Sequence, residues 1–420
     1  MVMEKYYLCI DLKSFFASVE CVERGLDPFE TNLVVSDAGR GKGAICLAVS
    51  PALKERGVAN RCRVFEIPET IDYIVAKPRM NLYIEYSANI YETYLKYISK
   101  EDIHIYSIDE CFFDITAYLE LYNKTPRELA TMLIDAVYKR TGVRATAGIG
   151  TNLFLAKVAL DITAKHSPDF IGYLDDEEFK KTIWFHKPLT DIWNVGRGIA
   201  NRLEKYGVYD LYGITRMDDR MLYREFGVNA EYLIDHAKGI EPCTIADIKS
   251  YETKTTSLSN SQILFEDYSF SDARLVLKEM VDILTLELVD KNLVTDAISL
   301  RIGYSDSKIK STGGTMKIAG YTNSQKKLTD YFLDYYDETT DRTHEIRKLT
   351  VVLNNLIAEE YLNLDFFSEF EFDEKERKKQ KAIIEIKKKY GKNAILKGMN
   401  YKEKATGRKR NKLVGGHNGD

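Results

Sequence analysis

Acidic residues stand at the ends of two short apolar segments of the chain. Asp11 follows the apolar run 7–10, and Asp109 and Glu110 follow the run 103–106. Such runs are typical of buried strands, where a carboxylate is costly to desolvate unless it meets a cation or a hydrogen-bond donor. Three carboxylates brought together would offer the oxygen ligands that Mg2+ prefers, as in two-metal phosphoryl transfer. The alternative is that each is an ordinary loop or capping carboxylate.

The composition is that of an ordinary globular protein. The chain has 420 residues, 45 % of them apolar and 30 % charged, and is long enough for about two to four domains. It contains no apolar run of about 18 residues, so we expect no membrane span. Its start has no basic segment before a long apolar one, so we expect no secretion. None of the six cysteines forms a C-x-x-C pair, which favours a reducing cytoplasm and argues against structural zinc.

The charge is distributed unevenly along the chain. The net charge is −4, yet residues 374–412 carry 16 Lys and Arg against four Asp and Glu. The remaining chain is therefore acidic, unlike the many DNA-binding domains that are basic throughout. The basic tail is either a solvated surface or a non-specific contact for phosphates.

Hydrophobic periodicity divides the first part of the chain into alternating strands and helices. The predicted elements are a strand and a helix start over 1–21, short strands and turns over 30–68, helices over 82–98 and 126–140, a strand over 145–149 and a helix that opens at 151. The glycine-rich segment 39–43 could be a phosphate-binding loop, but a strand-like segment follows where such a loop requires a helix. A hairpin turn is the preferred interpretation.

The second part begins with short helices and ends in a mixed module. Residues 171–243 are predicted to be helical. Within them, segment 192–208 has the shape of a helix–hairpin–helix, whose Gly-x-Gly turn presents backbone N–H groups to a phosphate; a plain helix turn is the alternative. From residue 250 the pattern is strand, helix, strand, strand, helix, strand, a split β-α-β module of about 100 residues. A further helix is predicted over 378–390, and the last residues are predicted to be loose.

Four signatures in this order resemble the Y-family of translesion DNA polymerases, and within it the UmuC-like branch of Gram-positive bacteria. They are CIDLKSFFASVE (9–20), SIDECFFDI (107–115), AGIGTNLFLAKVALDITAK (147–165) and the helix–hairpin–helix at 192–208. The resemblance covers about residues 5–365 and implies an α+β fold with right-hand polymerase architecture. It implies a palm at 1–21 and 79–168, fingers at 22–78, a helical thumb at 169–243, a βαββαβ little finger at 250–358, and a clamp-peptide candidate with the basic tail at 359–420.

The resemblance implies that the carboxylates are catalytic. Asp11, Asp109 and Glu110 become the palm residues that hold two Mg2+ ions, with the backbone carbonyl of Leu12 as a further ligand. One metal would lower the pKa of the primer 3′-hydroxyl, and the other would neutralise the leaving pyrophosphate. Asp114, further along the same strand, is predicted to be structural.

Two phenylalanines open the helix that follows Asp11. Phe16 matches the family's steric gate, an aromatic ring under the sugar that leaves no room for a 2′-hydroxyl, and Phe15 is a nucleotide-binding candidate. The alternative is that both are core residues. Because adjacent helical positions face apart, we predict one ring in each role.

Lysines are implied as ligands of the incoming triphosphate. Lys165 holds the family's Ala-Lys position, and Lys54 lies in the fingers segment where relatives commonly have Arg. A lysine contacts phosphate as a point charge rather than as a fork. Lys157 is predicted to face the template–primer backbone, and Lys13 replaces a second acidic residue that some relatives carry.

Contacts with DNA and with a sliding clamp are also implied. Gly196 and Gly198 of the helix–hairpin–helix would contact the DNA backbone, and the little finger would hold the duplex mostly through phosphates. Segment 361–367 resembles the apolar peptide that docks on the bacterial sliding clamp, with an aromatic strap on the little finger as the alternative. The clamp-binding candidates are Leu362, Leu364, Phe366 and Phe367. A poorer candidate, 262–265, is predicted to pack locally.

The implied function is error-prone, template-directed synthesis of DNA from dNTPs past damaged bases, in an SOS-type response and without a proofreading exonuclease. The protein is expected in the cytoplasm, and at the nucleoid when active, with a recombinase filament or a UmuD-like subunit as candidate partners. Two rivals remain. A nucleotidyl cyclase would have no duplex to hold, and a non-catalytic DNA- and clamp-binding regulator would have no need for three carboxylates and Phe16.

Overall fold

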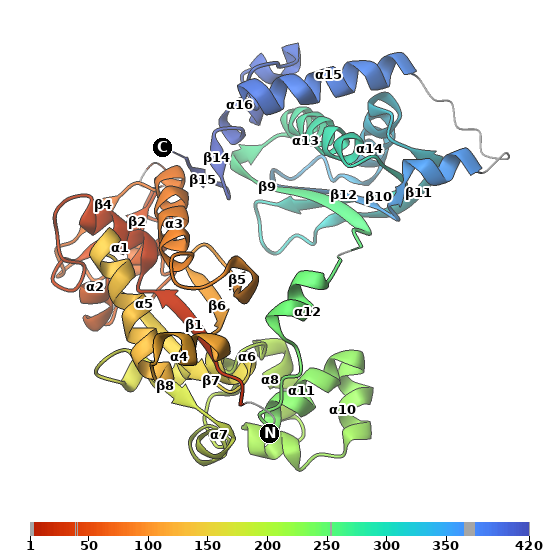
Figure 1. Ribbon diagram of the computed structural model, residues 1–420. Helices are drawn as coiled ribbons and strands as arrows, with labels where there is room; N and C mark the ends of the chain where they lie inside the picture. Colours follow the sequence, from red (N-terminus) through yellow and green to blue (C-terminus); the bar gives the residue numbers. More distant parts are fainter. Residues whose placement is uncertain (1–3, 38, 40, 253, 365–373, 420) are drawn as a thin grey trace. The chain divides into compact units, whose positions relative to one another are not determined.

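The computed structural model describes residues 4–37, 39, 41–252, 254–364 and 374–419. The chain divides into two compact units, one of Met1–Tyr251 with His417–Asp420 and the other of Glu252–Gly416. Both are mixtures of helices and sheets, which confirms the predicted α+β fold class (Figure 1). Among the described residues, no helix has the length and apolar character needed to cross a bilayer.

The first unit is built on a five-stranded sheet in the order β5-β6-β1-β7-β8 (Figure 1). Its strands are β1 (Tyr7–Leu12), β5 (Ile103–Ile105), β6 (Glu110–Asp114), β7 (Ala145–Gly150) and β8 (Ile171–Leu174). β1 lies in the middle and pairs antiparallel with both β6 and β7. Its apolar residues are at most 3 % exposed, as the predicted buried strand requires.

Helices cover both faces of this sheet. Alternate residues of a strand point to opposite faces, so Cys9 and Asp11 share one face of β1. On that face, Cys9 packs with Leu153 of α6 (Leu153–Val158), which continues into a π-helical segment at Ala159–Thr163. On the opposite face, α3 (Met80–Tyr94) packs beside α5 (Pro126–Thr141).

Two glycines of β7 allow α6 to lie directly against the sheet. A Cβ atom on Gly148 would lie 2.2 Å from the carbonyl oxygen of Ala156 and 2.2 Å from the nitrogen of Leu160. A Cβ atom on Gly150 would lie 2.2 Å from the nitrogen of Ala156. A closely packed interior cannot admit such contacts with backbone unless the helix shifts. The two glycines therefore set how closely α6, and every side chain it carries, approaches the sheet.

A smaller, three-stranded sheet has the order β3-β2-β4. Its strands are β2 (Leu33–Ser36), β3 (Cys46–Val49) and β4 (Ile74–Ala76). Because β2 and β3 pair antiparallel, segment 39–43 belongs to a hairpin connection, as predicted. The helix α1 (Phe15–Val22) packs on β2 and β3, and α2 (Pro51–Glu55) follows β3.

Short helices form most of the remaining part of the first unit. They are α4 (Thr116–Tyr122), α7 (Asp176–Thr182), α8 (Arg197–Glu204), α9 (Leu211–Thr215), α10 (Asp219–Phe226), α11 (Ala230–Ala237) and α12 (Ile245–Ser250). The prediction for 171–243 holds except at its start, where the chain forms β8. Phe154 of α6 and Phe179 of α7 are both buried in the apolar core of this region, which ties the helices to the sheet.

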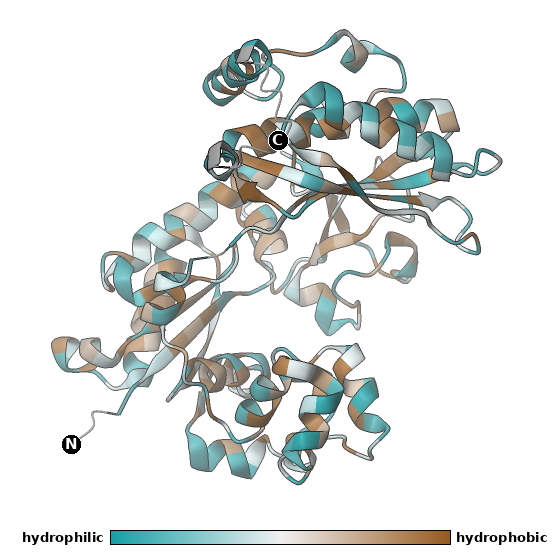
Figure 2. Ribbon diagram, turned by 90° about the vertical axis from the view of Figure 1, so that its right-hand side faces the viewer, coloured by the Kyte–Doolittle hydropathy of each residue, from teal (hydrophilic) through white to brown (hydrophobic). Residues whose placement is uncertain are grey.

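The second unit contains the predicted β-α-β-β-α-β module. Its elements are β9 (Ser257–Tyr268), α13 (Phe270–Asp290), β10 (Leu293–Tyr304), β11 (Thr312–Thr322), α14 (Gln325–Thr339) and β12 (Ile346–Asn354), followed by β13 (Ile357–Ala358). The main sheet has the order β11-β10-β12-β9 and is antiparallel throughout. The helices α13 and α14 carry apolar residues interspersed with hydrophilic ones (Figure 2), and their apolar residues share one core with the sheet.

Residues 374–416 are a folded part of the second unit. The helix α15 (Glu374–Tyr390) packs along α13, and α16 (Gly407–Arg410) follows it. The carboxylate of Glu279 on α13 is 2 % exposed and accepts hydrogen bonds from the backbone N–H groups of Thr406 at 2.7 Å and Gly407 at 3.0 Å. Several lysines of this segment form ion pairs with acids of the same unit: Lys388 with Asp290, Lys397 with Asp282, and Lys404 with Glu266. Part of the tail's positive charge is therefore balanced within the unit.

Replacing Gly148 by alanine should destabilise the protein by about 2 to 4 kcal/mol, because the added methyl group would collide with the backbone of α6. Gly43→Ala is the matched control, since a Cβ atom there meets nothing within 4 Å. Urea unfolding followed by circular dichroism compares the two variants with the parent chain. Equal midpoints for all three would contradict the close approach of α6 to β7.

Candidate active site

The pairing of β1 with β6 brings two of the predicted carboxylates together. In the register of the two strands, Asp11 lies directly opposite Glu110. Asp109 precedes Glu110, and its carbonyl oxygen accepts a hydrogen bond of 2.9 Å from the N–H of Leu12. Its carboxylate accepts a hydrogen bond of 2.6 Å from the hydroxyl of Ser107. One end of the central strand pair therefore carries all three predicted acids.

Lys157 balances part of this charge from α6. Its Nζ lies 2.8 Å from Oε1 of Glu110 and 3.0 Å from Oδ1 of Asp161, and the residue is only 7 % exposed. The thiol of Cys9 donates to the same Oε1 of Glu110 at 3.1 Å. The prediction that Lys157 faces the DNA backbone is therefore corrected. The buried ammonium group is held by two carboxylates, because the β7 glycines place α6 against this face of the sheet.

The electrostatics of this edge favour a bound cation. Burial, together with the neighbouring charges of Asp109 and Glu110, raises the pKa of Asp11 to about 8, although Lys157 acts to lower it. An acid in such surroundings ionises readily only when more positive charge is supplied. The carboxylates and the Leu12 carbonyl are hard oxygen donors, which suit Mg2+.

The carboxylates do not form a ready-made metal cage. Within the part of the chain that the structure describes, no group of three or more His, Cys, Asp or Glu side chains is arranged to hold a metal ion. The contacts explain this, since Glu110 is directed toward Lys157 and Cys9 while Asp109 is bonded to Ser107. The donor set fits Mg2+ in charge and chemistry, and binding would require these carboxylates to share or exchange their present partners.

The two phenylalanines of α1 differ in burial, as expected for adjacent helical positions that face apart. Phe15 is 3 % exposed and lies in the core, so its side chain is not available to a nucleotide, which corrects that assignment. Phe16 is only partly buried, and its ring stacks on Tyr83 of α3 with centroids 4.4 Å apart and planes 14° apart. Phe16 is thus the ring with an exposed part and a rigid support.

Three lysines lie within electrostatic reach of one another, and two of them, Lys13 and Lys54, also of Asp11. The pKa of Lys13 is lowered by desolvation and lowered further by the charges of Lys54 and Lys165. The charge of Asp11 acts to raise it. Desolvation also lowers the pKa of Lys54, again with Lys165 adding to the effect. Lysines that disfavour one another's charge are stabilised by a polyanion, so the cluster suits a triphosphate. Lys13 was not among the lysines predicted to bind the triphosphate, and its sequence signal was a lysine where some relatives carry an acid.

Asp114 has the structural role that was predicted for it. It stands at the far end of β6 from Glu110, and its carboxylate accepts a hydrogen bond of 3.0 Å from the backbone N–H of Thr116. This contact closes the turn into α4.

The glycines of the helix–hairpin–helix lie at the start of α8. Gly196 is the residue before the helix and Gly198 lies in its first turn; both are exposed. A side chain at either position would meet nothing within 4 Å, so the backbone there is open. Trp193, just before the turn, donates a hydrogen bond of 3.2 Å to the hydroxyl of Tyr106, which connects this hairpin to the end of β5.

The clamp-binding candidates fall mostly outside what the structure describes. Leu362 and Leu364 belong to a short 3-10 helix, Glu359–Leu364, while Phe366 and Phe367 lie outside the described residues. The poorer candidate, 262–265, is part of β9, where Gln262 and Leu264 are buried but Ile263 and Phe265 are exposed, so only alternate residues pack locally.

The chain is similar to known proteins over most of its length. The impB/mucB/samB family matches residues 10–161, and the C-terminal domain of the same family matches residues 255–366. The chain is 31 % identical to the "Putative UV-damage repair protein UvrX" of Bacillus subtilis, over 98 % of this chain and 97 % of that protein. It is 29 % identical to "DNA polymerase IV 2" of Halalkalibacterium halodurans, over 99 % and 100 % of the two chains. A solved Y-family DNA polymerase chimera shares its fold, with a TM-score of 0.63 and 21 % identity over 84 % of this chain and 99 % of that one.

Replacing Asp11 by asparagine should raise the free energy of unfolding by about 1 to 2 kcal/mol in the presence of a chelator. A carboxyl group whose pKa is higher in the folded than in the unfolded chain weakens folding at neutral pH, and the amide removes this penalty. Asp102→Asn is the control, because that carboxylate only accepts a hydrogen bond of 2.7 Å from Tyr118 and should lose stability. Thermal unfolding with EDTA and then with excess Mg2+ provides the measurement. Added Mg2+ should stabilise the parent chain more than Asp11→Asn, and an unchanged difference would contradict metal binding at Asp11.

Proposed function

Because the chain belongs to the impB/mucB/samB family, the Y-family of translesion DNA polymerases, we propose that the edge formed by β1 and β6 is where it extends a DNA primer past damaged template bases. The chain is a DNA-directed DNA polymerase, and its family implies dependence on a divalent metal. The name of its UvrX relative refers to the repair of UV damage, which supports a role in an SOS-type response.

The observation that carries this proposal is the position of Asp11. It lies opposite Glu110 across the strand pair, next to Asp109 in the fold, and within the electrostatic reach of Lys13 and Lys54. Acids that need a cation thus adjoin lysines that need an anion. A nucleoside triphosphate with its divalent metals satisfies both requirements in one complex.

The chain's own residues have distinct tasks in this mechanism. Asp11, Asp109 and the Leu12 carbonyl would hold the metals together with Glu110, and two bound Mg2+ ions would supply activation of the 3′-hydroxyl and charge neutralisation at the pyrophosphate. Lys157 pairs with Glu110 in a buried position and so supplies a positive charge beside it. Once these charges are balanced, catalysis depends mainly on the positioning of the substrates and on electrostatic stabilisation of the transition state.

Substrate binding is assigned to the neighbouring cations and aromatic ring. We propose that Lys13, Lys54 and Lys165 neutralise the triphosphate. Phe16 is the proposed steric gate, since its partly exposed ring can occupy the space of a 2′-hydroxyl while Phe15 remains in the core.

Contacts with the duplex are assigned to parts of both units. The open backbone at Gly196 and Gly198 would bind a DNA phosphate, and the second unit would hold the duplex mainly through phosphates, so that binding weakens steeply with salt. A sliding clamp that binds segment 361–367, and a recombinase filament or a UmuD-like subunit, remain proposed partners.

Replacing Asp109 by alanine should reduce primer extension by at least about a thousandfold, because the site would lose a metal-binding carboxylate. The assay is extension of a labelled primer with Mg2+ and dNTPs on an undamaged template and on one with an abasic site. Asp114→Asn, at the far end of β6, is the matched control and should remain active. If Asp109→Ala still passed the abasic site, the assignment of the catalytic edge would be wrong. If the parent chain bound duplex but extended nothing, even with clamp added, the rival of a non-catalytic regulator would be favoured.

Replacing Lys13 by alanine should raise the KM for an incoming dNTP about tenfold or more, because a charge-assisted contact with phosphate contributes roughly 1.5 to 3 kcal/mol. Single-nucleotide incorporation kinetics give KM and kcat separately. Lys139→Ala on α5, an exposed lysine remote from Asp11 in the sequence and on a different element, is the control. Lys13→Arg should retain most of the affinity. An unchanged KM in Lys13→Ala would remove this lysine from the triphosphate site.

A further inference from the structure

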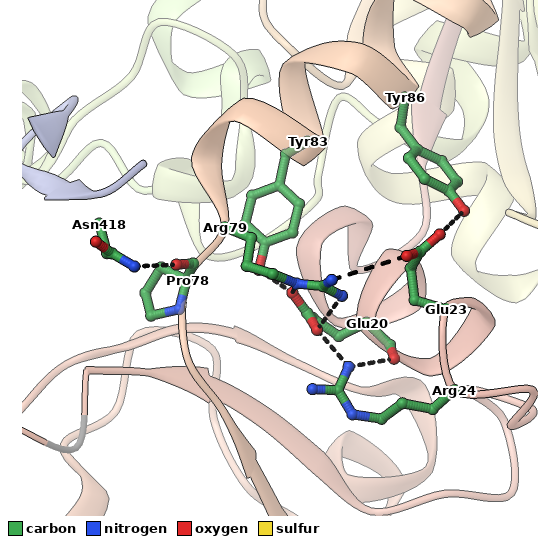
Figure 3. A network of polar contacts seen from close by, with 8 residues as sticks. All are labelled: Glu20, Glu23, Arg24, Pro78, Arg79, Tyr83, Tyr86 and Asn418. Atoms are coloured by element: carbon green, nitrogen blue, oxygen red, sulfur yellow. Dashed lines mark hydrogen bonds and ion pairs between the residues drawn. The ribbon is translucent and has the colours of Figure 1, made fainter. Parts of the chain in front are cut away.

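A second buried carboxylate lies outside the catalytic edge, on the helix that carries Phe16. Glu20 of α1 is fully buried and faces the start of α3 (Figure 3). Arg79, the residue before α3, reaches it with two parallel hydrogen bonds, Nε to Oε1 at 3.0 Å and Nη2 to Oε2 at 2.8 Å. Arg24, one turn further along α1, pairs with the same carboxylate. Glu20 is therefore a fixed anionic centre between two helices.

The remaining partner of Glu20 connects it to the proposed steric gate. The hydroxyl of Tyr83 donates a hydrogen bond of 2.7 Å to Oε1 of Glu20, and Tyr83 is fully buried. The ring of Tyr83 is the one on which Phe16 stacks, at 4.4 Å between centroids. A continuous series of contacts thus leads from Arg79 through Glu20 and Tyr83 to Phe16.

The start of α3 is itself held on both sides of Arg79. The backbone N–H of Asn81 donates a hydrogen bond of 2.9 Å to the carbonyl oxygen of Gly419, and the side chain of Asn418 donates one of 3.4 Å to the carbonyl oxygen of Pro78 (Figure 3). The last described residues of the chain therefore fix the backbone from which Arg79 extends.

Packing alone does not account for an ionised group at this position. Burial acts to raise the pKa of Glu20, but the hydrogen bonds from Arg79, Arg24 and Tyr83 overcome this effect and lower it, so the carboxylate is charged at neutral pH. A buried ion pair adds little stability compared with apolar residues of the same volume. A charged acceptor instead fixes the orientation of its hydrogen-bond donor. It holds the Tyr83 hydroxyl, and hence the Tyr83 ring, in one place.

We propose that Glu20, held by Arg79, is a positioning residue for sugar discrimination, which keeps Tyr83 behind Phe16 so that the gate ring cannot yield to a 2′-hydroxyl. The inference rests on the proposed function, in which Phe16 excludes ribonucleotides. Steric exclusion is only as strong as the resistance of the excluding group to displacement. A ring that could move by a fraction of an ångström would admit the extra oxygen.

The chain contains a matched pair of residues one helical turn away. Glu23 of α1 accepts a hydrogen bond of 2.7 Å from the hydroxyl of Tyr86, which lies three residues after Tyr83 on α3 (Figure 3). The chemistry is the same, but both residues of this pair are more exposed than Glu20 and Tyr83. Because Glu23 also pairs with Arg79 at 3.7 Å, the control for the loss of a glutamate–tyrosine bond between the two helices is Tyr86→Phe, which removes the bond and keeps both acids.

The test is the ratio of kcat/KM for a dNTP to kcat/KM for the matching rNTP, opposite the same template base. Glu20→Gln and Tyr83→Phe should lower this ratio about tenfold or more through faster rNTP incorporation, since small displacements in a site have large kinetic effects. Tyr86→Phe should leave the ratio unchanged. Phe16→Ala sets the lower limit of discrimination, and Glu20→Asp, which keeps the charge, should retain more discrimination than Glu20→Gln.

The ratio separates positioning from a general loss of structure. A partly unfolded variant loses activity with both nucleotides equally, so its ratio of dNTP to rNTP use stays constant. If Glu20→Gln does not fold, Tyr83→Phe, which removes a single oxygen atom, provides the test. Ratios for Glu20→Gln or Tyr83→Phe equal to that of Tyr86→Phe would overturn the inference alone. An unchanged ratio in Phe16→Ala would overturn it through its premise. A parent chain that incorporates no dNTP would overturn the proposed function and the inference with it.

Discussion

The ion pair between Lys157 and Glu110 is the interaction on which the rest of the site depends. Antiparallel pairing places Asp11 opposite Glu110, and burial together with the charges of Asp109 and Glu110 raises the pKa of Asp11 to about 8. Only a cation delivered into the core allows so much negative charge to accumulate there. Lys157 provides it because α6 lies close against β7, and that approach depends on the absence of side chains at Gly148 and Gly150.

A second buried acid organises the neighbouring helix in a similar way. Glu110 and Glu20 are both buried, and basic side chains hold both: Lys157 holds the first, and Arg79 with Arg24 holds the second. The first acid fixes the charge where a reaction can occur, and the second fixes the ring beside it. In the proposed function, these buried ion pairs hold the catalytic carboxylates and the gate ring in position, and apolar packing supplies the stability.

Much of this arrangement could be predicted from local sequence patterns. The carboxylates at strand ends, the hairpin at 39–43, the β-α-β-β-α-β module and the different burial of Phe15 and Phe16 follow from local residue patterns, whereas the choice of Phe16 as the gate came from the family resemblance. The features that were missed depend on contacts between distant segments. A lysine usually reaches solvent, and only the close approach of α6 to the sheet buries Lys157. The basic tail likewise folds because α13 presents acids to it, which a charge count cannot show.

The measurement that tests the central claim most directly is metal-directed cleavage of the polypeptide. Fe2+ would replace Mg2+ in the complex with primer–template DNA and an incoming dNTP, and ascorbate with peroxide would generate short-lived hydroxyl radicals that cut the backbone next to the bound ion. We predict cuts beside Asp11 and beside Asp109 and Glu110, and we expect excess Mg2+ to suppress these cuts. Cuts confined to other parts of the chain, with these two segments intact, would contradict it.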